Sequence, residues 1–429
     1  MPTTTADSHA ITSTPGPRRS GSARLDRFVT DYDGPTPVVV VDLDVVAERL
    51  HALRTALPMA EVFYAVKANP APEILEVLLD EAVSFDVASP GEIDRCLSMG
   101  ADPSRISFGN TVKKARDIAD AYAHGVRLFT FDCAAELDKL IEHAPGATVM
   151  CRIAVDGVGA DWPLSRKFGT SRDEAVELLV RAASHGLGLG VSFHVGSQQR
   201  NLDAWDAALC EVAKLASELA GAGQTLEVLN LGGGFPAIYD DGVPSMAEYG
   251  RAIRSALDAW FPERLPRVIV EPGRYLVGDA GVLVSEVVLV SDRAEHGRWV
   301  YLDIGLFGGL AETLGEAIRY RIATARDAGA RRSACLAGPT CDSADVLYEK
   351  APYDLPADLA AGDRVTFHAT GAYTTSYSSV GFNGFAPLAS TYLPRQRYTH
   401  TALRSGSRLV AHTKSMNGFE TRTHPCEAG

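Results

Sequence analysis

An apolar run early in the chain ends in a single lysine. Residues 62–66 are all apolar and lead to Lys67, and Asn69-Pro70 then interrupts the strand pattern. A lysine at the mouth of an apolar core can have a lowered pKa, and its free amine then condenses with carbonyl groups. The segment therefore predicts a lysine that forms an imine. A strand-end lysine that only reaches solvent is the other interpretation of this segment, and the rest of the chain must decide between them.

Other chemically useful residues also stand at the ends of apolar, β-branched runs. They are Asp86, Arg152, His194, Ser197, the triplet Gly232-Gly233-Gly234, Glu271, Gly273 and Arg274. Each has an ordinary structural explanation when it is taken alone, such as a satisfied core histidine or a tight glycine turn. Gathered on one rim, they predict a site.

The elements that must position these residues alternate regularly between residues 60 and 275. Eight apolar runs are separated by amphipathic stretches typical of helices, for example 72–80, 91–98, 113–123, 173–185, 203–221 and 246–260. The runs are 62–69, 84–89, 106–110, 128–132, 148–155, 190–197, 228–235 and 267–275. Eight strand–helix units predict a (β/α)₈ barrel, whose active site lies at the carboxyl ends of the strands. A doubly wound open sheet is the competing fold, but it usually has fewer strands and an early glycine-rich fingerprint.

The glycine triplet suggests what the site binds. Three glycines after a strand let backbone N–H groups approach an anion, and barrels favour a phosphate site after strands seven and eight. A lysine for an imine, a phosphate cradle, a histidine and an acid together indicate pyridoxal 5'-phosphate as cofactor. That cofactor needs a carboxylate to keep its ring nitrogen protonated, and Glu271 suits this role.

The pattern changes after residue 275. Short strands are predicted at 282–290, 299–304, 334–337 and 364–369, with turns rich in Gly, Pro and Asp. We therefore expect a leader over 1–35, the barrel over 36–275, a mainly β domain over 276–396 and a tail over 397–429. The leader is expected to be largely disordered, with a possible strand in the β domain. Residues 36–42 can either add a strand to that domain or lead into the barrel.

Composition narrows the partners and the compartment. The chain has 429 residues, 22% of them charged, and a net charge of −13, which argues against nucleic acid or an anionic membrane as partner. Its seven cysteines are scattered without metal-type spacing, so we expect neither a disulfide framework nor a metal site, and a cytoplasmic location fits. No apolar stretch is long enough to span a bilayer.

From about residue 36 to residue 388 the chain resembles the fold-type III pyridoxal-phosphate decarboxylases of basic amino acids. This family includes the ornithine, lysine/ornithine and diaminopimelate decarboxylases. The motifs that carry the resemblance are YAVKANP, FDVASPGEI, SFHVGSQ, GGGFP, EPGRYLVG, GPTCDSAD, GAYT and FNGF. The leader and the tail lie outside it.

The resemblance implies roles for individual residues. Lys67 would form the internal aldimine, His194 would stack on the pyridine ring and Glu271 would pair with the ring nitrogen. Asp86 would support the lysine side of the site, while Ser197, Gly234, Gly273, Arg274 and Tyr373 would bind the phosphate. Arg152, Gly232 and Gly233 are further expected cofactor-binding residues. Cys341 would be the general acid that reprotonates Cα. The resemblance also implies an antiparallel homodimer in which Cys341 and Asp342 reach the partner's site.

The substrate is less determined than the reaction. Asp342 can pair with a distal ammonium group, whereas a diaminopimelate enzyme typically has Glu at that position. A second acid is expected at Glu316, with Glu312 as its neighbour, and Phe382 is expected to contact the substrate. L-Ornithine to putrescine is the reaction favoured, with L-lysine to cadaverine also possible. The alternatives are a diaminopimelate decarboxylase, a secondary-metabolic decarboxylase and a non-catalytic regulatory homologue.

Overall fold

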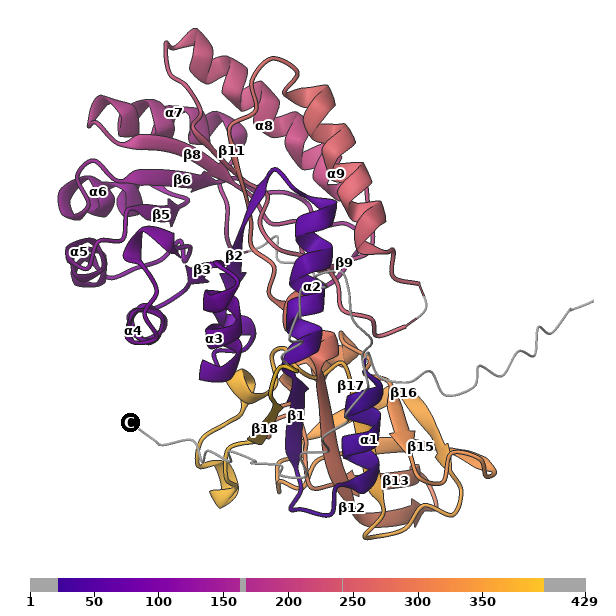
Figure 1. The fold of residues 1–429 in the computed structure, drawn as a ribbon. Coiled ribbons are helices and arrows are strands. Elements are labelled where there is room, and N and C mark those ends of the chain that lie inside the picture. The colour runs from indigo at the N-terminus through magenta and orange to yellow at the C-terminus, as the bar shows by residue number, and fades with distance from the viewer. Residues whose placement is uncertain (1–21, 163–166, 241, 397–429) are drawn as a thin grey trace, which may run out of the picture.

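The computed structural model describes residues 22–162, 167–240 and 242–396. The predicted tail and the first 21 residues of the predicted leader lie outside these residues. Figure 1 shows two bodies: a barrel ringed by helices and, below it, a domain built mainly of strands.

The barrel is closed by eight parallel strands in the order β10-β11-β2-β3-β4-β5-β6-β8. Every strand falls inside or overlaps one of the eight predicted runs, so the (β/α)₈ prediction is confirmed. The strands are β2 (Ala60–Ala65), β3 (Ser84–Val87), β4 (Ile106–Phe108), β5 (Leu128–Phe131), β6 (Thr148–Arg152), β8 (Gly188–Ser192), β10 (Val228–Asn230) and β11 (Arg267–Val270).

Helices cover the outside of the barrel and begin where local sequence favours them. Pro72 and Pro90 stand at the first positions of α3 and α4, where a missing N–H costs nothing. Ser245 caps α9 in a reciprocal capping box with Glu248. The barrel helices are α2 (Leu43–Ala56), α3 (Pro72–Asp80), α4 (Pro90–Ser98), α5 (Ala115–Ala123), α6 (Ala134–His143), α7 (Arg172–Ser184), α8 (Ala204–Gly221) and α9 (Met246–Trp260).

Alternation along the strands divides the barrel interior into an apolar and a polar part. Phe63, Leu128, Met150, Val228 and Ile269 form a separate buried cluster from five strands. Side chains two residues apart share a face, so Met150, Val228 and Ile269 are followed on the inner face by the polar residues Arg152, Asn230 and Glu271. The strand register sets Asp86 beside Ser107, and Arg152 beside Ser192 and then Asn230. The polar site at the carboxyl ends of the strands therefore borders an apolar cluster inside the barrel.

The second body is an eight-stranded sheet. Its strands are β1 (Val38–Asp42), β12 (Gly281–Arg293), β13 (Gly297–Leu302), β14 (Ile322–Thr324), β15 (Arg331–Ala337), β16 (Val346–Pro356), β17 (Arg364–His368) and β18 (Ala389–Leu393). Short apolar runs in the sequence predicted β12, β13, β15 and β17, whereas β14, β16 and β18 were not predicted. A short two-stranded ribbon of β7 (Ala160–Trp162) and β9 (Ser197–Gln199) lies apart from both sheets.

The N-terminal segments differ from the predicted boundaries. β1 pairs with β12 and β18, so residues 38–42 belong to the β domain and the barrel's own strands begin at β2. Residues 23–31, placed by sequence in the leader, form helix α1 (Ala23–Asp31), and its Leu25 packs against Val38 and Val40. All five residues of β1 are buried, so no alternation marked the sheet to which they belong.

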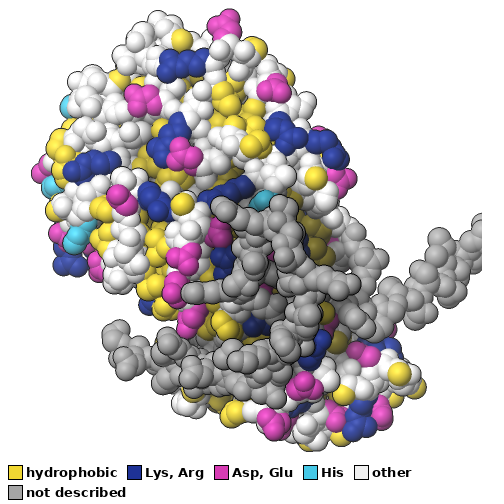
Figure 2. All heavy atoms as spheres, viewed as in Figure 1, with side chains coloured by type: hydrophobic (Ala, Val, Ile, Leu, Met, Phe, Trp, Pro, Cys, Tyr) yellow, Lys and Arg dark blue, Asp and Glu magenta, His cyan; other side chains and the backbone are white. Residues whose placement is uncertain are grey.

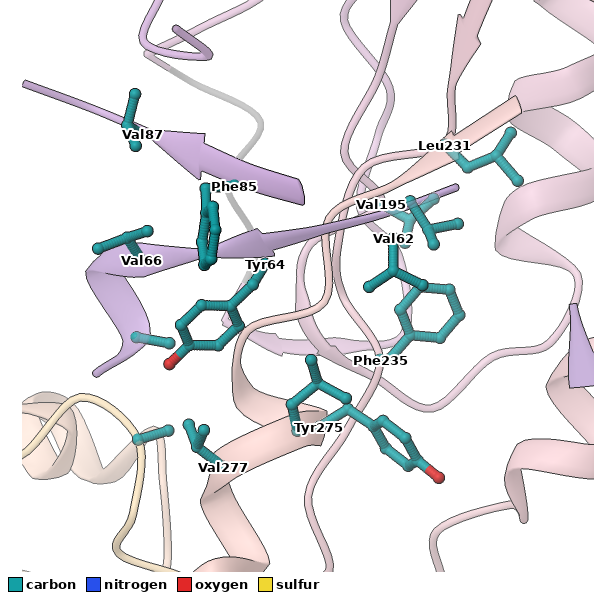
Figure 3. Close-up of a cluster of buried hydrophobic side chains, with 14 of the residues drawn as sticks. Val62, Tyr64, Val66, Phe85, Val87, Val195, Leu231, Phe235, Tyr275 and Val277 are labelled. Atoms are coloured by element: carbon teal, nitrogen blue, oxygen red, sulfur yellow. The ribbon is translucent and has the colours of Figure 1, made fainter. Parts of the chain in front are cut away.

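A continuous apolar core joins the barrel to the segment that leads into the β domain. Figure 3 shows Val66 near Phe85 and Val277 below the ring of Tyr64, with Phe235 and Tyr275 in the same cluster. The short helix α10 (Arg274–Val277) follows the end of β11 and leads on to β12, so the two bodies share packing where the site lies.

Charged side chains of both signs are interspersed over the barrel face in Figure 2. None of the helices in the described ranges is both long and apolar enough to cross a membrane.

Candidate active site

Lys67 lies just beyond β2, in the short 3₁₀ turn η1 (Val66–Ala68). Its neighbours Val66 and Ala68 are buried, whereas its own side chain is 48% exposed and its Nζ lies 3.3 Å from Oδ2 of Asp86. Desolvation lowers the pKa of Lys67, but the interactions with Asp86, Tyr373 and Glu271 outweigh it, and the pKa is raised overall. The expectation of a lowered lysine pKa is therefore wrong for this structure, because the run of apolar neighbours gave no sign of the two carboxylates.

Asp86 comes from the inner face of β3 and is 4% exposed. Burial raises its pKa, and the charge of Lys67 opposes that shift. Its second oxygen, Oδ1, is buried and has no hydrogen-bond partner in the described part of the chain. Asp86 therefore pairs with the lysine amine through its other oxygen, Oδ2.

The glycine triplet follows β10 and packs tightly against neighbouring backbone. Gly232 and Gly234 have φ angles of +65° and +100°, in the region that favours glycine. A Cβ atom on Gly233 would lie 2.7 Å from the carbonyl oxygen of Glu271. Within the described ranges, the N–H groups of Gly233 and Gly234 donate no hydrogen bond. Both are therefore free to meet an anion.

Arg274, the first residue of α10, is buried beside this loop. Its Nε and Nη2 donate to Oγ of Ser197 at 3.3 and 3.2 Å. On its other edge, Nη1 donates to Tyr239 Oη at 2.7 Å and to Glu312 at 2.6 Å, and Nη2 donates to the second oxygen of Glu312. The ring centroid of Tyr373 lies 4.8 Å from the guanidinium carbon. One edge of the guanidinium is thus clamped, and the other faces Ser197.

Glu271 follows β11 and points into the site. Its Oε1 accepts a hydrogen bond of 2.5 Å from Nδ2 of Asn230. Burial and the nearby charge of Asp86 raise the pKa of Glu271 to about 7, and Lys67 opposes the shift. This carboxyl can therefore exchange a proton near neutral pH.

His194 follows β8, and its Nδ1 accepts the N–H of Gly196 at 3.1 Å. Burial and the positive charges of Arg152 and Lys67 hold the pKa of His194 well below its usual value, so the ring is neutral. Because residue 233 is glycine, Nε2 approaches the loop closely: a Cβ atom there would lie 3.2 Å away. A neutral ring suits stacking better than a charged one.

Nine of the twelve predicted cofactor residues line one small cavity at the carboxyl ends of the strands, and Asp86, Arg152 and Gly232 do not. It is lined by Ala65, Lys67, His194, Ser197, Gly233, Gly234, Phe235, Glu271, Gly273, Arg274 and Tyr373. Asp86 borders it through Lys67, and the charge of Arg152 acts on Asp86, His194 and Glu271. The guanidinium of Arg152 itself lies 5.1 Å from the ring centre of Phe168.

The predicted acid and substrate residues lie elsewhere on the chain. Cys341 and Asp342 are exposed, and the N–H of Cys341 donates to Asn383 at 3.0 Å. The ring centroid of Phe382 lies 4.9 Å from that of Phe307. Both rings border a larger groove of about 590 Å³, which is separate from the cavity at Lys67.

Glu316 is also absent from the Lys67 cavity, and it has a positive φ of +64°. Its carboxylate accepts N–H bonds from Glu349, Lys350 and Ala351 of β16 at 2.9, 2.6 and 3.0 Å. This placement differs from the predicted role in substrate binding, because backbone amides already occupy both oxygens.

Three residues of the site were missed by sequence reasoning. Glu312 was named only as a neighbour of Glu316, yet it holds Arg274. Asn230 stands two residues before the glycine triplet, a position that could have drawn attention to it. Tyr239 lies in a loop, where no periodicity marks it.

The donors fit pyridoxal phosphate. The free glycine N–H groups, Ser197 and one edge of Arg274 suit its phosphate, and Glu271 suits the ring nitrogen. An amine, an acid and an anion cradle in one barrel are therefore the groups that this cofactor requires.

Comparison with known proteins defines the family. Residues 43–278 match the model of the pyridoxal-dependent decarboxylase, pyridoxal binding domain. The chain belongs to this family of pyridoxal-dependent decarboxylases. It is 39% identical over 353 residues to the lysine/ornithine decarboxylase of Selenomonas ruminantium, covering 82% of this chain and 88% of that one.

Two solved structures have the same fold. The lysine/ornithine decarboxylase of Vibrio vulnificus, complexed with putrescine, superposes with a TM-score of 0.76 at 31% identity, covering 87% of this chain and 99% of that one. The arginine decarboxylase of Paramecium bursaria Chlorella virus, bound to agmatine, gives a TM-score of 0.78 at 30% identity, covering 86% and 100%. The predicted family, cofactor and fold are thus confirmed.

Proposed function

We propose that this protein decarboxylates a basic L-amino acid, with L-ornithine to putrescine and CO₂ as the first candidate and L-lysine to cadaverine as the second. The observation that carries the proposal is the amine of Lys67, 3.3 Å from Asp86, in a cavity that also contains Glu271 and ends at Arg274. The relatives named above act on or bind lysine-, ornithine- and arginine-type ligands, which supports this substrate class.

The residues divide the work by position. Lys67 is the attachment point of the cofactor and Asp86 holds its amine in place. Arg274, Ser197 and the glycine N–H groups bind the phosphate, His194 covers one face of the ring and Glu271 keeps the ring nitrogen protonated. Bound pyridoxal phosphate supplies an electron sink for the bond that breaks when the α-carboxylate leaves.

Cys341 and Asp342 are proposed to enter the active site of a second subunit. Both are exposed on the single chain, beside a groove lined by apolar side chains such as Phe307, Phe382 and Phe385. We propose a homodimer in which Cys341 returns a proton to Cα and Asp342 pairs with the distal ammonium of the substrate. Mixing the Lys67→Ala and Cys341→Ala proteins tests this: shared sites restore part of the activity, whereas separate sites restore none.

The two variants also test the roles directly. Lys67→Ala should abolish the visible absorbance of the lysine-bound cofactor. Normal turnover by that variant would contradict the role of Lys67 as the attachment point of the cofactor. Cys341→Ala should keep the absorbance but impair amine formation. Unchanged turnover and product would remove Cys341 from the reaction.

One assay separates the candidate substrates. Release of CO₂ from ornithine, lysine, arginine and meso-diaminopimelate should be compared at equal concentrations. The Asp342 carboxylate favours a cationic distal group, so diaminopimelate should be the poorest substrate. Preferred turnover of diaminopimelate would overturn the proposed class. A purified protein without cofactor absorbance would favour a non-catalytic homologue.

We further propose that the protein works in the cytoplasm, where its free cysteines remain reduced.

A further inference from the structure

Asn230 joins two parts of the site that are far apart in sequence. It is the last residue of β10 and is fully buried on the inner face of the barrel. Its Nδ2 donates to Oε1 of Glu271 at 2.5 Å, and its Oδ1 accepts the N–H of Gly232 at 2.9 Å. A single side chain therefore connects the acid at the end of β11 to the first residue of the glycine loop.

These two contacts fix the orientation of the amide. The backbone N–H of Gly232 can only donate, so the oxygen of Asn230 must face it. The NH₂ group is then turned toward Glu271, where it can only donate. The NH₂ group of Asn230 therefore donates to Oε1 of Glu271, and this hydrogen bond is stronger when Glu271 is ionised than when it is neutral.

We propose that Asn230 is a positioning residue that favours the ionised Glu271 carboxylate and aims it at the ring nitrogen of the cofactor, while it fixes the start of the phosphate-binding loop. This inference rests on the role proposed above for Glu271. One amide side chain would then set the distance between Glu271, at the ring end of the cofactor, and the glycine loop, at its phosphate end.

The surroundings of Glu271 explain why such a donor is needed. Burial and the charge of Asp86 on β3 favour the protonated carboxyl, while Lys67 on η1 and Arg152 on β6 favour the ionised one. The hydrogen bond from Asn230 adds to the second group. A protonated Glu271 could not keep a proton on the ring nitrogen, because it would carry no negative charge.

Asn230→Leu tests the proposal on the cofactor-loaded protein. Leucine has the same number and branching of side-chain heavy atoms but neither donates nor accepts a hydrogen bond. We expect the pH midpoint of the bound-cofactor absorbance to move by one unit or more, kcat to fall at least tenfold and KM to change less than threefold. An unchanged absorbance titration and kcat in this variant would overturn the inference.

Asn230→Asp keeps the shape and separates positioning from packing. Below the pKa of the new carboxyl, its protonated form can still donate to Glu271; above it, two carboxylates face each other. We expect near-normal absorbance and turnover at pH 6 and a loss of both at pH 9. Equal impairment at both values, with a melting temperature lowered to the same extent, would assign Asn230 a packing role only.

Asn201→Asp is the matched control, since Asn201 is exposed and its Oδ1 only accepts the N–H of Asp203. It should leave the titration unchanged. The test is also independent of the substrate assignment. A protein that bound the cofactor and showed the Asn230-dependent titration, yet decarboxylated no basic amino acid, would refute the proposed function and leave the positioning role standing.

Discussion

Replacing Glu312 by Gln should lower the free energy of unfolding far more than Glu61→Gln, the same substitution in an exposed ion pair. Glu312 and Arg274 form a buried two-point ion pair, with 7% and 3% of their side chains exposed. Removing one partner of such a pair costs about 3–5 kcal/mol, because the other charge stays buried. Arg274 keeps its bonds to Tyr239 and Ser197, so we expect a loss of about 3 kcal/mol, at the lower end of that range.

Urea denaturation of the two variants under identical conditions measures this loss. For a chain of this size the denaturant slope is at least ~3 kcal/mol per molar, so the midpoint of Glu312→Gln should fall by up to about 1 M. Glu61→Gln is the control: Glu61 also makes a two-point pair, with Arg267, but both side chains are almost half exposed. Such a surface pair contributes ~0–1 kcal/mol. Equal midpoints for the two variants would refute the reasoning from burial.

Two further predictions concern the cofactor end of the site. The pKa of Glu271 is raised from 4.5 to about 7, so the folded state holds this proton more tightly than the unfolded chain and loses stability as the pH rises through that window. Glu271→Gln cannot titrate, so the cofactor-free variant should gain stability relative to wild type between pH 5 and pH 8 in urea melts; a constant difference would contradict this. Gly233→Ala should weaken binding of pyridoxal phosphate at least tenfold by absorbance titration, because its Cβ would lie 2.7 Å from a carbonyl oxygen and 3.2 Å from Nε2 of His194. Gly221→Ala, where nothing lies within 4 Å of the new Cβ, should bind normally.

Local patterns were sufficient for the barrel and for most of its rim. Strand and helix periods are properties of short segments, so the eight runs and the helices between them could be recognised without tertiary information. Strand ends in a parallel barrel all meet at one face, so Lys67, His194, Glu271 and Arg274 could be placed together from their positions alone. The glycine triplet likewise signalled a close backbone approach.

The elements of the β domain were harder to predict from the sequence. β1 (Val38–Asp42) is a uniformly buried run, and nothing in such a run names the strands that will pair with it. Helix α1 (Ala23–Asp31) is short and polar, and it is held through Leu25 by a sheet that is distant in sequence. Both depend on long-range contacts.

The chain by itself determined which residue types stand at each strand end, and with them the fold, the cofactor and the family. Only the tertiary structure decided how these groups act on one another. It placed two carboxylates near Lys67, where they contribute to its raised pKa. It also directed Glu312, rather than Glu316, toward Arg274, and it set the amide of Asn230 to donate to Glu271. The reason is physical: charge and hydrogen-bond energies depend on distances between side chains that are separated by tens to hundreds of residues, and no local pattern encodes those distances.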